Sequence, residues 1–472
     1  MRTSLKLGYG VGQIGTGAKN TAFSIFLFFY YNQVLGVPGS LAGMASLIAL
    51  IVDAVTDPMV GQLSDRFKSR WGRRHPFMLF GAIPFGLALY MLFAPPAGLD
   101  TNGLVWWLLG FAVLVRTLLT FFYVPHLSLG AEMVRDYHDR TSLIGYRIFF
   151  QMGGGLFVTM VGLIVFFSPS EGFANGMLNA ASYPSFAIFS GALGSAAMLM
   201  SVIATRSTIA DLSDPIPDPN AGHPILGFIT VFKTLNQFAF RKLFMTMLVF
   251  TTVVGVSQTL IIYTGTYLFG FSPEQLAIAA ASPILGVLVG SLAVKRMSRT
   301  LDKKKSMMMC LFWGALFGYS TQIAFLLGIL ESMSIGSRLL FVFIMNGISQ
   351  IFFVGLYIII DSMLSDTIDQ HEMETGRREE GMFFSASSFA QKASFGLGAL
   401  VAGIGLDVIK FPKAAAADAV PMDVLANFAW FAGPMTMVFL LSSIFLIRRY
   451  PIDEKEHARI TQAIQDAKAA SA

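Results

Sequence analysis

Two aspartates stand inside a long apolar segment near the start of the chain. Asp53 and Asp57 lie in the run SLIALIVDAVTDPMVGQL, four residues apart, so a helix would place both side chains on one face about one turn apart. An ionised carboxylate at membrane depth is costly and usually marks an ion or substrate pathway. The pair therefore indicates a site that holds a cation, a proton or a basic partner inside a membrane.

The structural alternative to a binding role differs between the two acids. Asp53 could hydrogen-bond a neighbouring helix, whereas Asp57 precedes Pro58 and could satisfy backbone groups freed by a proline kink. For a binding role, hard cations such as sodium prefer oxygen ligands, which the two carboxylates and the hydroxyls of Thr56 and Thr120 could supply. A proton is the other coupling ion to consider, because a buried acid beside a second acid holds a proton readily.

Further polar side chains fall within apolar segments and are candidates for contact with a substrate. Lys19 lies in the middle of the first segment, where it either contacts the substrate or neutralises an acid. Arg147 lies near a segment end and could extend to the surface, whereas Lys392 lies too deep to do so easily. Tyr123 and His126 flank a proline, an arrangement that suits a ligand cavity but equally suits a packed, hydrogen-bonded pair. These five residues form the predicted substrate-binding set.

Arg116 lies in the same segment as Tyr123 and His126. We expect it nearer the outer end of that segment, in a structural pairing and outside the binding site.

Composition places the chain in a membrane. Its 472 residues are 54% hydrophobic and only 13% charged, whereas a soluble domain usually carries about 25% charged residues. The mean hydropathy is +0.64. The first apolar segment is long and lacks a small-residue cleavage site after a short apolar core, so we expect a retained span rather than a signal peptide.

The hydropathy pattern predicts twelve membrane-spanning helices. We expect them near residues 8–36, 39–64, 76–95, 104–133, 144–168, 182–205, 241–269, 274–294, 306–331, 337–364, 381–409 and 424–447. The longest polar interruption divides them into two sets of six. We therefore expect an N-terminal half at 1–205, a cytoplasmic linker at 206–240 that is partly helical from residue 227, a C-terminal half at 241–450 and a cytoplasmic tail at 451–472.

The two halves resemble repeats of one another. Arg66 and Arg296 both follow the second span of their half, 230 positions apart, and Arg140 and Arg377 lie 237 positions apart in loops of mixed charge. Parallel repeats of six helices with a binding site near the midplane are typical of one large transporter architecture. Basic inner loops alone would be found in any protein of twelve spans.

The placement of basic residues predicts the orientation in the membrane. Nearly all lysines and arginines fall in alternate loops and near the two ends of the chain, so both termini should face the cytoplasm. An even number of spans satisfies this. The expected location is the inner (plasma) membrane, as a multi-pass protein in contact with lipid, and we expect a monomer.

Charged residues at the cytoplasmic edge predict a gate. The loop SDRFKSRWGRRHP of the first half is basic, while the second half carries acids in the corresponding region. Ion pairs between the halves would close the inner side and break when it opens; the alternative is that the basic residues only set topology. The predicted gating residues are Asp65, Arg66, Arg73, Arg74, Asp366, Asp369 and Glu372.

Several blocks of the chain resemble a known family. The run VDAVTDPMVGQLSDRFKSRWGRRHPFMLFGA is similar to the second-helix and loop signature of the glycoside–pentoside–hexuronide:cation symporters, the melibiose-permease group of the major facilitator superfamily. KLGYGVGQIG, YVPHLSLGAEMVRDYHDRTSLIGYR and SMLSDTIDQHEMETGRREEGMFF also match family patterns. The resemblance implies an all-α membrane protein of twelve helices in two pseudo-symmetric halves, the major facilitator fold.

The resemblance also implies a function. It suggests cation-coupled symport of a sugar, glycoside or related small solute by alternating access, with H⁺ or Na⁺ as the coupling ion and no other cofactor. The family's cation site matches Asp53, Thr56 and Asp57, and its charged residues of helices five and eleven match Arg147 and Lys392.

The chain departs from the family pattern at the sugar-binding positions. The polar pair of helix one aligns with Thr16 and Gly17, the helix-four acid with Tyr123 and the helix-four tryptophan with Leu127. These departures keep open a carrier of an amphipathic substrate such as a lysophospholipid, or a non-coupled facilitator. With no acid at Tyr123 and with Lys19 cancelling one charge, the site would carry one net negative charge, so we expect protons ahead of sodium.

Other classes of protein fit the sequence less well. A channel would need a continuous polar pore, and no pore-loop motif appears. The six histidines are scattered without metal-binding spacing, so neither a metal site nor an enzyme is expected. Cys310, the single cysteine, excludes an intramolecular disulfide, and nothing indicates a nucleic-acid partner, because the net charge of +5 comes from short loops.

Overall fold

The computed structural model describes residues 1–134, 136–211, 234–284, 286–290, 301–416 and 419–471. Within these ranges the chain is helical throughout, apart from turns, loops and one isolated bridge between Ser170 and Phe173. The prediction of an all-α protein is therefore confirmed.

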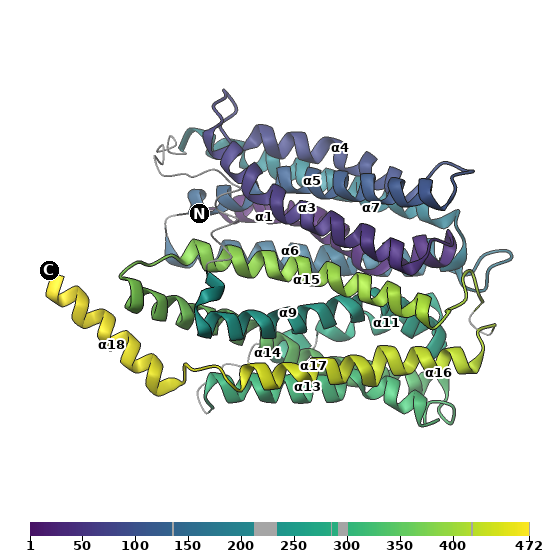
Figure 1. Cartoon of the computed structure of the whole chain (residues 1–472). Coiled ribbons are helices and arrows are strands. Elements are labelled where there is room, and N and C mark those ends of the chain that lie inside the picture. Colours follow the sequence, from purple (N-terminus) through teal and green to yellow (C-terminus); the bar gives the residue numbers. More distant parts are fainter. Residues whose placement is uncertain (135, 212–233, 285, 291–300, 417–418, 472) are drawn as a thin grey trace.

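The first part of the chain packs as one group of helices, drawn in purple to blue in Figure 1. Its long helices contact one another in the pairs α3–α5, α4–α5, α4–α7 and α2–α6. The elements are α1 Thr3–Val11, α2 Gln13–Thr21, η1 Ala22–Leu27, η2 Tyr30–Val34, α3 Gly39–Arg66, α4 His75–Phe93, α5 Thr101–Met133, α6 Tyr137–Val161, η3 Gly162–Phe166, η4 Gly176–Leu178, α7 Ser182–Thr205 and η5 Arg206–Asp211.

The second part forms another group, drawn in green to yellow, in which α15 and α17 pack on α9 and α13 packs on α14 and α17. We call the two groups the N-half and the C-half. The elements of the C-half are η6 Thr234–Asn236, α9 Phe238–Thr259, α10 Ile261–Tyr263, η7 Thr264–Leu268, α11 Pro273–Ala279, α13 Lys303–Leu326, α14 Ile335–Thr375, α15 Glu380–Val408, α16 Met422–Trp430, η8 Phe431–Met435, α17 Thr436–Ile447 and α18 Glu454–Ser471.

Eleven helices of the described residues are long and apolar enough to cross a membrane. The segment 3–34 is also helical, but it is divided into α1, α2, η1 and η2, so it does not count as one long helix. Gly12, between α1 and α2, keeps helical dihedral angles, and η1 and η2 are π-helical stretches that interrupt the regular hydrogen-bond ladder. The twelve predicted spans correspond to these eleven helices and this segmented first span.

Local sequence accounts for several helix ends. Asp100 and Ser334 accept hydrogen bonds from the first turns of α5 and α14, and Ser272 with Gln275 forms a capping box before α11. The long α14 ends at Gly376, which adopts a left-handed conformation with φ of 71°. Each cap satisfies backbone groups that a helix end leaves without partners.

Some predictions fall outside the described residues. These are the linker residues 212–233, including the predicted helical stretch from 227 to 233, and the basic loop with Lys295, Arg296 and Arg299. The flanking parts of the linker are described: η5 and η6 are short 3-10 helices, and α9 begins at Phe238.

The two halves meet closely at one end of the bundle. Both termini lie at the opposite end, at the left of Figure 1, which we call the terminus end; the other is the distal end. Helix α3 of the N-half packs along α15 of the C-half. A Cβ atom at Gly43 would lie 2.6 Å from the carbonyl oxygen of Ala399, and one at Gly403 would collide with the carbonyl oxygen of Gly39. Small residues therefore allow the two backbones to touch.

Polar contacts add to this distal seam. The Asp407 carboxylate accepts hydrogen bonds of 2.8 Å from the backbone N–H groups of both Gly39 and Ser40, so it caps a helix of the other half. The Tyr263 hydroxyl donates to the side-chain oxygen of Asn32 over 2.6 Å. One buried apolar cluster runs from Phe26 and Phe29 of the N-half to Tyr263 and Phe428 of the C-half, whereas a second cluster is confined to the C-half.

Candidate functional site

The two predicted acids lie side by side on α3. Asp53 is 9% exposed, and the hydroxyl of Thr120 on α5 lies 3.1 Å from a carboxylate oxygen of Asp53 and 2.8 Å from one of Asp57. A hydroxyl has one proton, so it can donate to only one carboxylate at a time. The hydroxyl of Thr56 donates instead to the backbone carbonyl of Asp53, at 3.2 Å, and is thus engaged on its own helix.

Lys392 reaches this pair from the other half. Its ammonium group lies 2.9 Å from Asp53 Oδ2 and also donates a hydrogen bond to Asp57 Oδ2, with its side chain 25% exposed. Helix α15 holds Lys392 twelve residues after its start at Glu380, opposite the acids of α3. The structure therefore brings together three of the predicted cation-site residues and one predicted substrate residue.

Arg116 belongs to the same cluster, which the sequence did not indicate. Its guanidinium lies 3.7 Å from Asp53 Oδ2 and 4.7 Å from the ring centre of Phe23, and its side chain is buried. The expected structural pairing is present, with Asp53 as the partner, but it lies within the cluster, because Arg116 is fifteen residues into the 33-residue helix α5, near its middle. The signal that could have found it is this position along the span.

Lys19 lies near the acids without touching them. Its ammonium group is 5.7 Å from the ring centre of Phe23 and within electrostatic reach of Asp53, Asp57 and Arg116. In the part of the chain that the structure describes, it forms no hydrogen bond or ion pair. With Lys392 and Arg116 also present, the cluster contains two acids and three basic groups. The prediction that the site carries one net negative charge is therefore wrong, because it counted only Lys19.

The remaining predicted substrate residues lie on the N-half side of the acids. Tyr123 is within electrostatic reach of Arg147 and of Asp57, and Arg147 is also near the hydroxyl of Tyr9. His126 is fully buried, and its ring nitrogens lie 3.0 Å from Gln13 Nε2 and 3.0 Å from the carbonyl oxygen of Tyr9. The structure thus places Tyr123 and Arg147 near the cluster and His126 in the packed interior of the N-half.

Six of the seven predicted gating residues form ion pairs among the described residues, and each of these pairs lies within one half. In the N-half, Arg73 and Arg74 both bind Glu132, and Arg74 lies 3.2 Å from Asp65. Burial among these groups lowers the pKa of Arg74. No ion pair of Arg66 occurs among the described residues.

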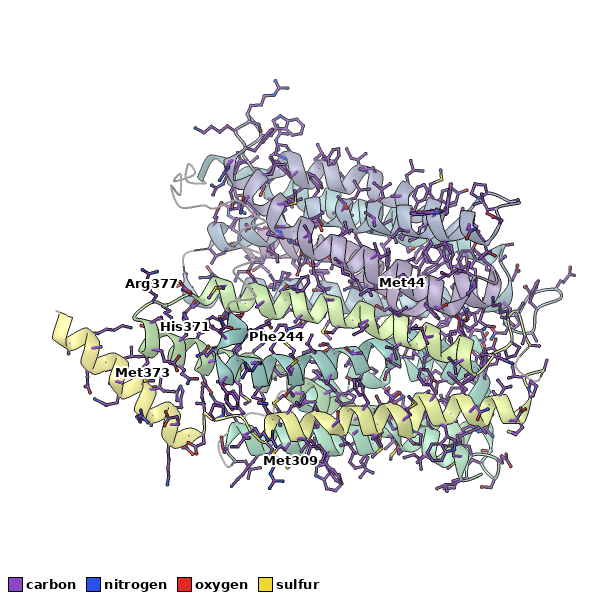
Figure 2. All side chains as sticks on the ribbon, viewed as in Figure 1. Met44, Phe244, Met309, His371, Met373 and Arg377 are labelled. Atoms are coloured by element: carbon purple, nitrogen blue, oxygen red, sulfur yellow. The ribbon has the colours of Figure 1, made fainter. Side chains whose placement is uncertain are left out.

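In the C-half, Asp366 pairs with Lys303 at 2.7 Å. Arg378 binds Glu372 at 2.7 Å and Asp369 at 3.0 Å, and Lys468 of α18 lies 2.8 Å from Glu372. Figure 2 places His371, Met373 and Arg377 in this region at the terminus end, with Met44 towards the distal end. Among the described residues these acids form no ion pair with the basic loop of the other half, which is the arrangement expected when the two halves are apart at this end.

No group of three or more histidine, cysteine or acidic side chains that could hold a metal ion occurs among the described residues. The side-chain oxygens that contact one another at the cluster belong to Asp53, Asp57 and Thr120. The position beside both carboxylates is taken by the Lys392 ammonium group.

Comparison with known proteins gives a consistent set of similarities. Residues 8–454 match the family described as MFS/sugar transport protein. The chain is 26% identical to the inner membrane symporter YicJ of Escherichia coli (strain K12), over 84% of this chain and 81% of that protein. It is 24% identical to the putative glycoside/cation symporter YagG of the same strain, over 98% and 95% of the two chains. A bacterial homologue of the iron transporter ferroportin, solved in an inward-facing state, shares the fold with a TM-score of 0.64 at 12% identity, over 95% of this chain and 98% of that one.

Proposed function

Since the chain belongs to the MFS/sugar transport protein family, we propose that it is a secondary active transporter that carries a sugar, glycoside or related small solute together with a cation. The name of the relative YagG, a putative glycoside/cation symporter, supports both parts of the proposal. The solute would cross the membrane chemically unchanged, so the protein would not be an enzyme.

The observation that carries the proposal is the contact of Lys392 with both acids. The acids belong to the N-half and the lysine to the C-half, so this ion pair joins the halves near the middle of the long helices α3 and α15. A buried carboxylate that loses its partner must gain another positive charge. A coupling cation that enters between Asp53 and Asp57 would therefore take the place of Lys392.

The exchange of partners explains how cation and solute would be coupled. Once released, the Lys392 ammonium group is free to donate hydrogen bonds to a solute in the space between the halves, beside the unpaired Lys19. Neither step is favourable alone: without the cation the acids hold Lys392, and without the solute Lys392 has no new partner. Binding of both would change the contact between the halves, which is what alternating access requires.

The coordination at the cluster favours a proton over sodium. A proton needs one carboxylate oxygen, whereas sodium needs several oxygens at once. The two carboxylates and Thr120 supply oxygens that contact one another, whereas the described contact of the Thr56 hydroxyl is with the Asp53 carbonyl on its own helix. Uptake driven by an imposed pH gradient, compared with an imposed sodium gradient, tests this choice; uptake that answers only to sodium would refute it.

The substitution Asp53→Asn tests the coupling role. In proteoliposomes, we expect the variant to exchange solute across the membrane but not to accumulate it against a gradient, measured with a panel of radiolabelled pentoses, hexoses and methyl glycosides. Asp423→Asn, at an exposed acid in the first turn of α16, is the matched control and should accumulate normally. Accumulation by Asp53→Asn at the wild-type rate would show that the coupling role is wrong.

The proposed location is the inner (plasma) membrane, with both termini in the cytoplasm. The name of the relative YicJ, an inner membrane symporter, supports the location, and the basic residues at the terminus end support the orientation. A fluorescent protein fused to the C-terminus should fluoresce if that end is cytoplasmic and remain dark if it is exported.

A further inference from the structure

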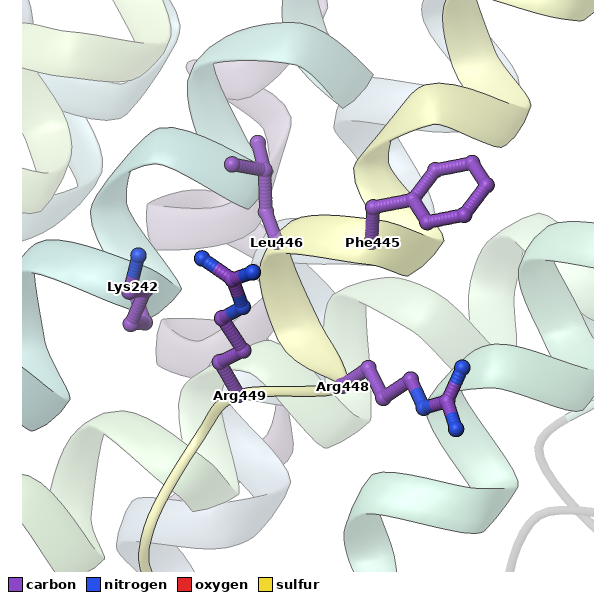
Figure 3. Close-up of a pocket in the computed structure, with 5 residues that line it drawn as sticks. All are labelled: Lys242, Phe445, Leu446, Arg448 and Arg449. Carbon is purple, nitrogen blue, oxygen red and sulfur yellow. The ribbon is translucent and has the colours of Figure 1, made fainter.

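A cavity at the terminus end of the C-half is bordered by basic side chains. It has a volume of about 460 Å³ and is lined by Lys242, Phe445, Leu446, Arg448 and Arg449 (Figure 3). In this view the head groups of Lys242 and Arg449 turn towards the same space, and Arg448 extends to the other side. Three positive charges therefore surround one cavity, on α9 and at the end of α17 and not on the helices that carry the central cluster.

The backbone holds these cations in place. Lys242 lies in the second turn of α9, and Arg448 and Arg449 follow directly on the last residue of α17. The next residue, Tyr450, is buried and donates to the carbonyl oxygen of Met363 at 3.2 Å, while its own carbonyl accepts from Lys304 at 3.2 Å. The turn that presents the two arginines is thus fixed against α14 and α13 before any ligand arrives.

The three cations have no counter-charge within the described ranges. Their side chains form no ion pair or hydrogen bond there, and Lys242 lies only over the ring of Phe238, at 5.3 Å. By contrast, Lys303 and Arg378 at the same end are each paired with a carboxylate. Cations left unpaired around a fixed cavity favour an anionic ligand.

The depth of the cavity in the membrane and its apolar wall indicate which kind of anion would bind there. Two candidate spans, Phe238–Thr259 and Met422–Ile447, begin and end here, which is where the apolar interior gives way to the headgroup layer. Phe445 is 72% exposed and stands beside the basic groups on the apolar side. A ligand that suits both surfaces carries a phosphate next to hydrocarbon.

We propose that this cavity binds the phosphate headgroup of an anionic membrane phospholipid, with its acyl chains against Phe445. Lys242 and Arg449 hold the phosphate oxygens, and Arg448 borders the site on its other side. The site does not depend on which solute the protein carries.

The test is a lipid titration of the purified full-length protein, read by native mass spectrometry after delipidation. We expect the first molecule of phosphatidylglycerol to bind about 10- to 30-fold more weakly to Lys242→Gln/Arg449→Gln than to the unsubstituted protein, because two charges near the headgroup are lost. Phosphatidylcholine should bind both proteins equally. Lys305→Gln/Lys455→Gln removes the same charge from exposed positions at the terminus end and should bind phosphatidylglycerol normally.

The single variant Arg449→Lys keeps the positive charge and should retain most of the affinity for phosphatidylglycerol. It therefore tests the site even if the double variant does not fold. Equal loss of phosphatidylglycerol in the Lys305→Gln/Lys455→Gln control would show unspecific attraction and overturn the site. Displacement of the lipid by excess inorganic phosphate would overturn the assignment to a lipid, since it would show a pocket for any phosphate.

Discussion

The distal end and the terminus end of the bundle are held together in different ways. At the distal end, glycines let α3 and α15 touch, and Asp407 caps a helix of the opposite half. At the terminus end, the ion pairs of the described residues join partners within the same half. The difference indicates that the contact between halves is made by backbone and small residues at one end, and that charges at the other stabilise each half separately.

Substitution of Lys392 should have the largest effect, because this residue joins the two halves through its ion pairs with Asp53 and Asp57. Lys392→Ala should lower the free energy of unfolding by about 3 kcal/mol, near the lower limit for a buried pair because the lysine is partly exposed. It should also abolish coupled accumulation. Lys392→Arg should recover stability better than transport, since a forked guanidinium differs in shape from an ammonium group. Normal transport by Lys392→Ala would remove this residue from the site.

Gly403→Ala tests the backbone contact of the distal seam. The new methyl group would collide with the carbonyl oxygen of Gly39. We therefore expect the arrangement in which the distal seam is closed to be destabilised by about 2 kcal/mol, and solute exchange to be at least about tenfold slower. Gly153→Ala on α6 is the matched control, because a methyl group there meets no atom within 4 Å. Equal exchange rates in the two variants would mean that the seam does not govern transport.

Asp407→Asn tests the polar part of the same seam and should cost about 1 kcal/mol, because the amide oxygen can still accept one of the two hydrogen bonds. A cysteine placed at the buried Val37 should then react faster with a maleimide, while the buried Cys310 gives little background. Asp100→Asn makes the same change at a helix cap inside the N-half and should leave this reactivity unchanged. A similar increase in both variants would show general loosening and not opening of the seam.

Arg378→Gln should have the smallest effect. Its partners Glu372, Asp369 and Glu380 lie in the same half, and the guanidinium is exposed, so we expect a loss below about 0.5 kcal/mol and unchanged Val37→Cys reactivity. The carboxylate of Glu380, followed by that of Glu372, raises the pKa of Arg378. A pKa raised on folding removes stability only as the pH rises through it, so Arg378 itself should cause no change in stability between pH 5 and 9. A large effect on seam reactivity would contradict the comparison of the two ends.

The sequence predicted the helices and the acid pair but not which end of the bundle is closed. The all-helical architecture and the placement of Asp53 and Asp57 on one face follow from local patterns, because a helix has 3.6 residues per turn. The twofold contact of Lys392 joins residues 335 positions apart, and no local pattern specifies such a pair. The depth of Lys392 in its span and the family resemblance indicated that this residue belongs to the site, but they did not show that it pairs with both acids.

Two features of the site depend on how helices far apart in the sequence are placed. Arg116 was expected in a structural pairing, but its partner Asp53 lies 63 positions away, and no local pattern specifies such a pair. The gating acids were expected to pair with the opposite half only while the inner side is closed, and a charge pattern does not say which end of the bundle is closed. His457 and Lys468 of α18, which the sequence treated only as a polar tail, lie against Asp366 and Glu372 instead.

The cap that Asp407 places on α3 has a consequence for how this protein can change over generations. The two groups that donate to the carboxylate are main-chain amides of residues 39 and 40, which every amino acid except proline possesses. Substitutions at residues 39 and 40, other than by proline, leave both donors of these two hydrogen bonds intact. Mutation can therefore change the strength of this contact mainly through the codon for residue 407, while the small size of Gly39 remains a separate constraint.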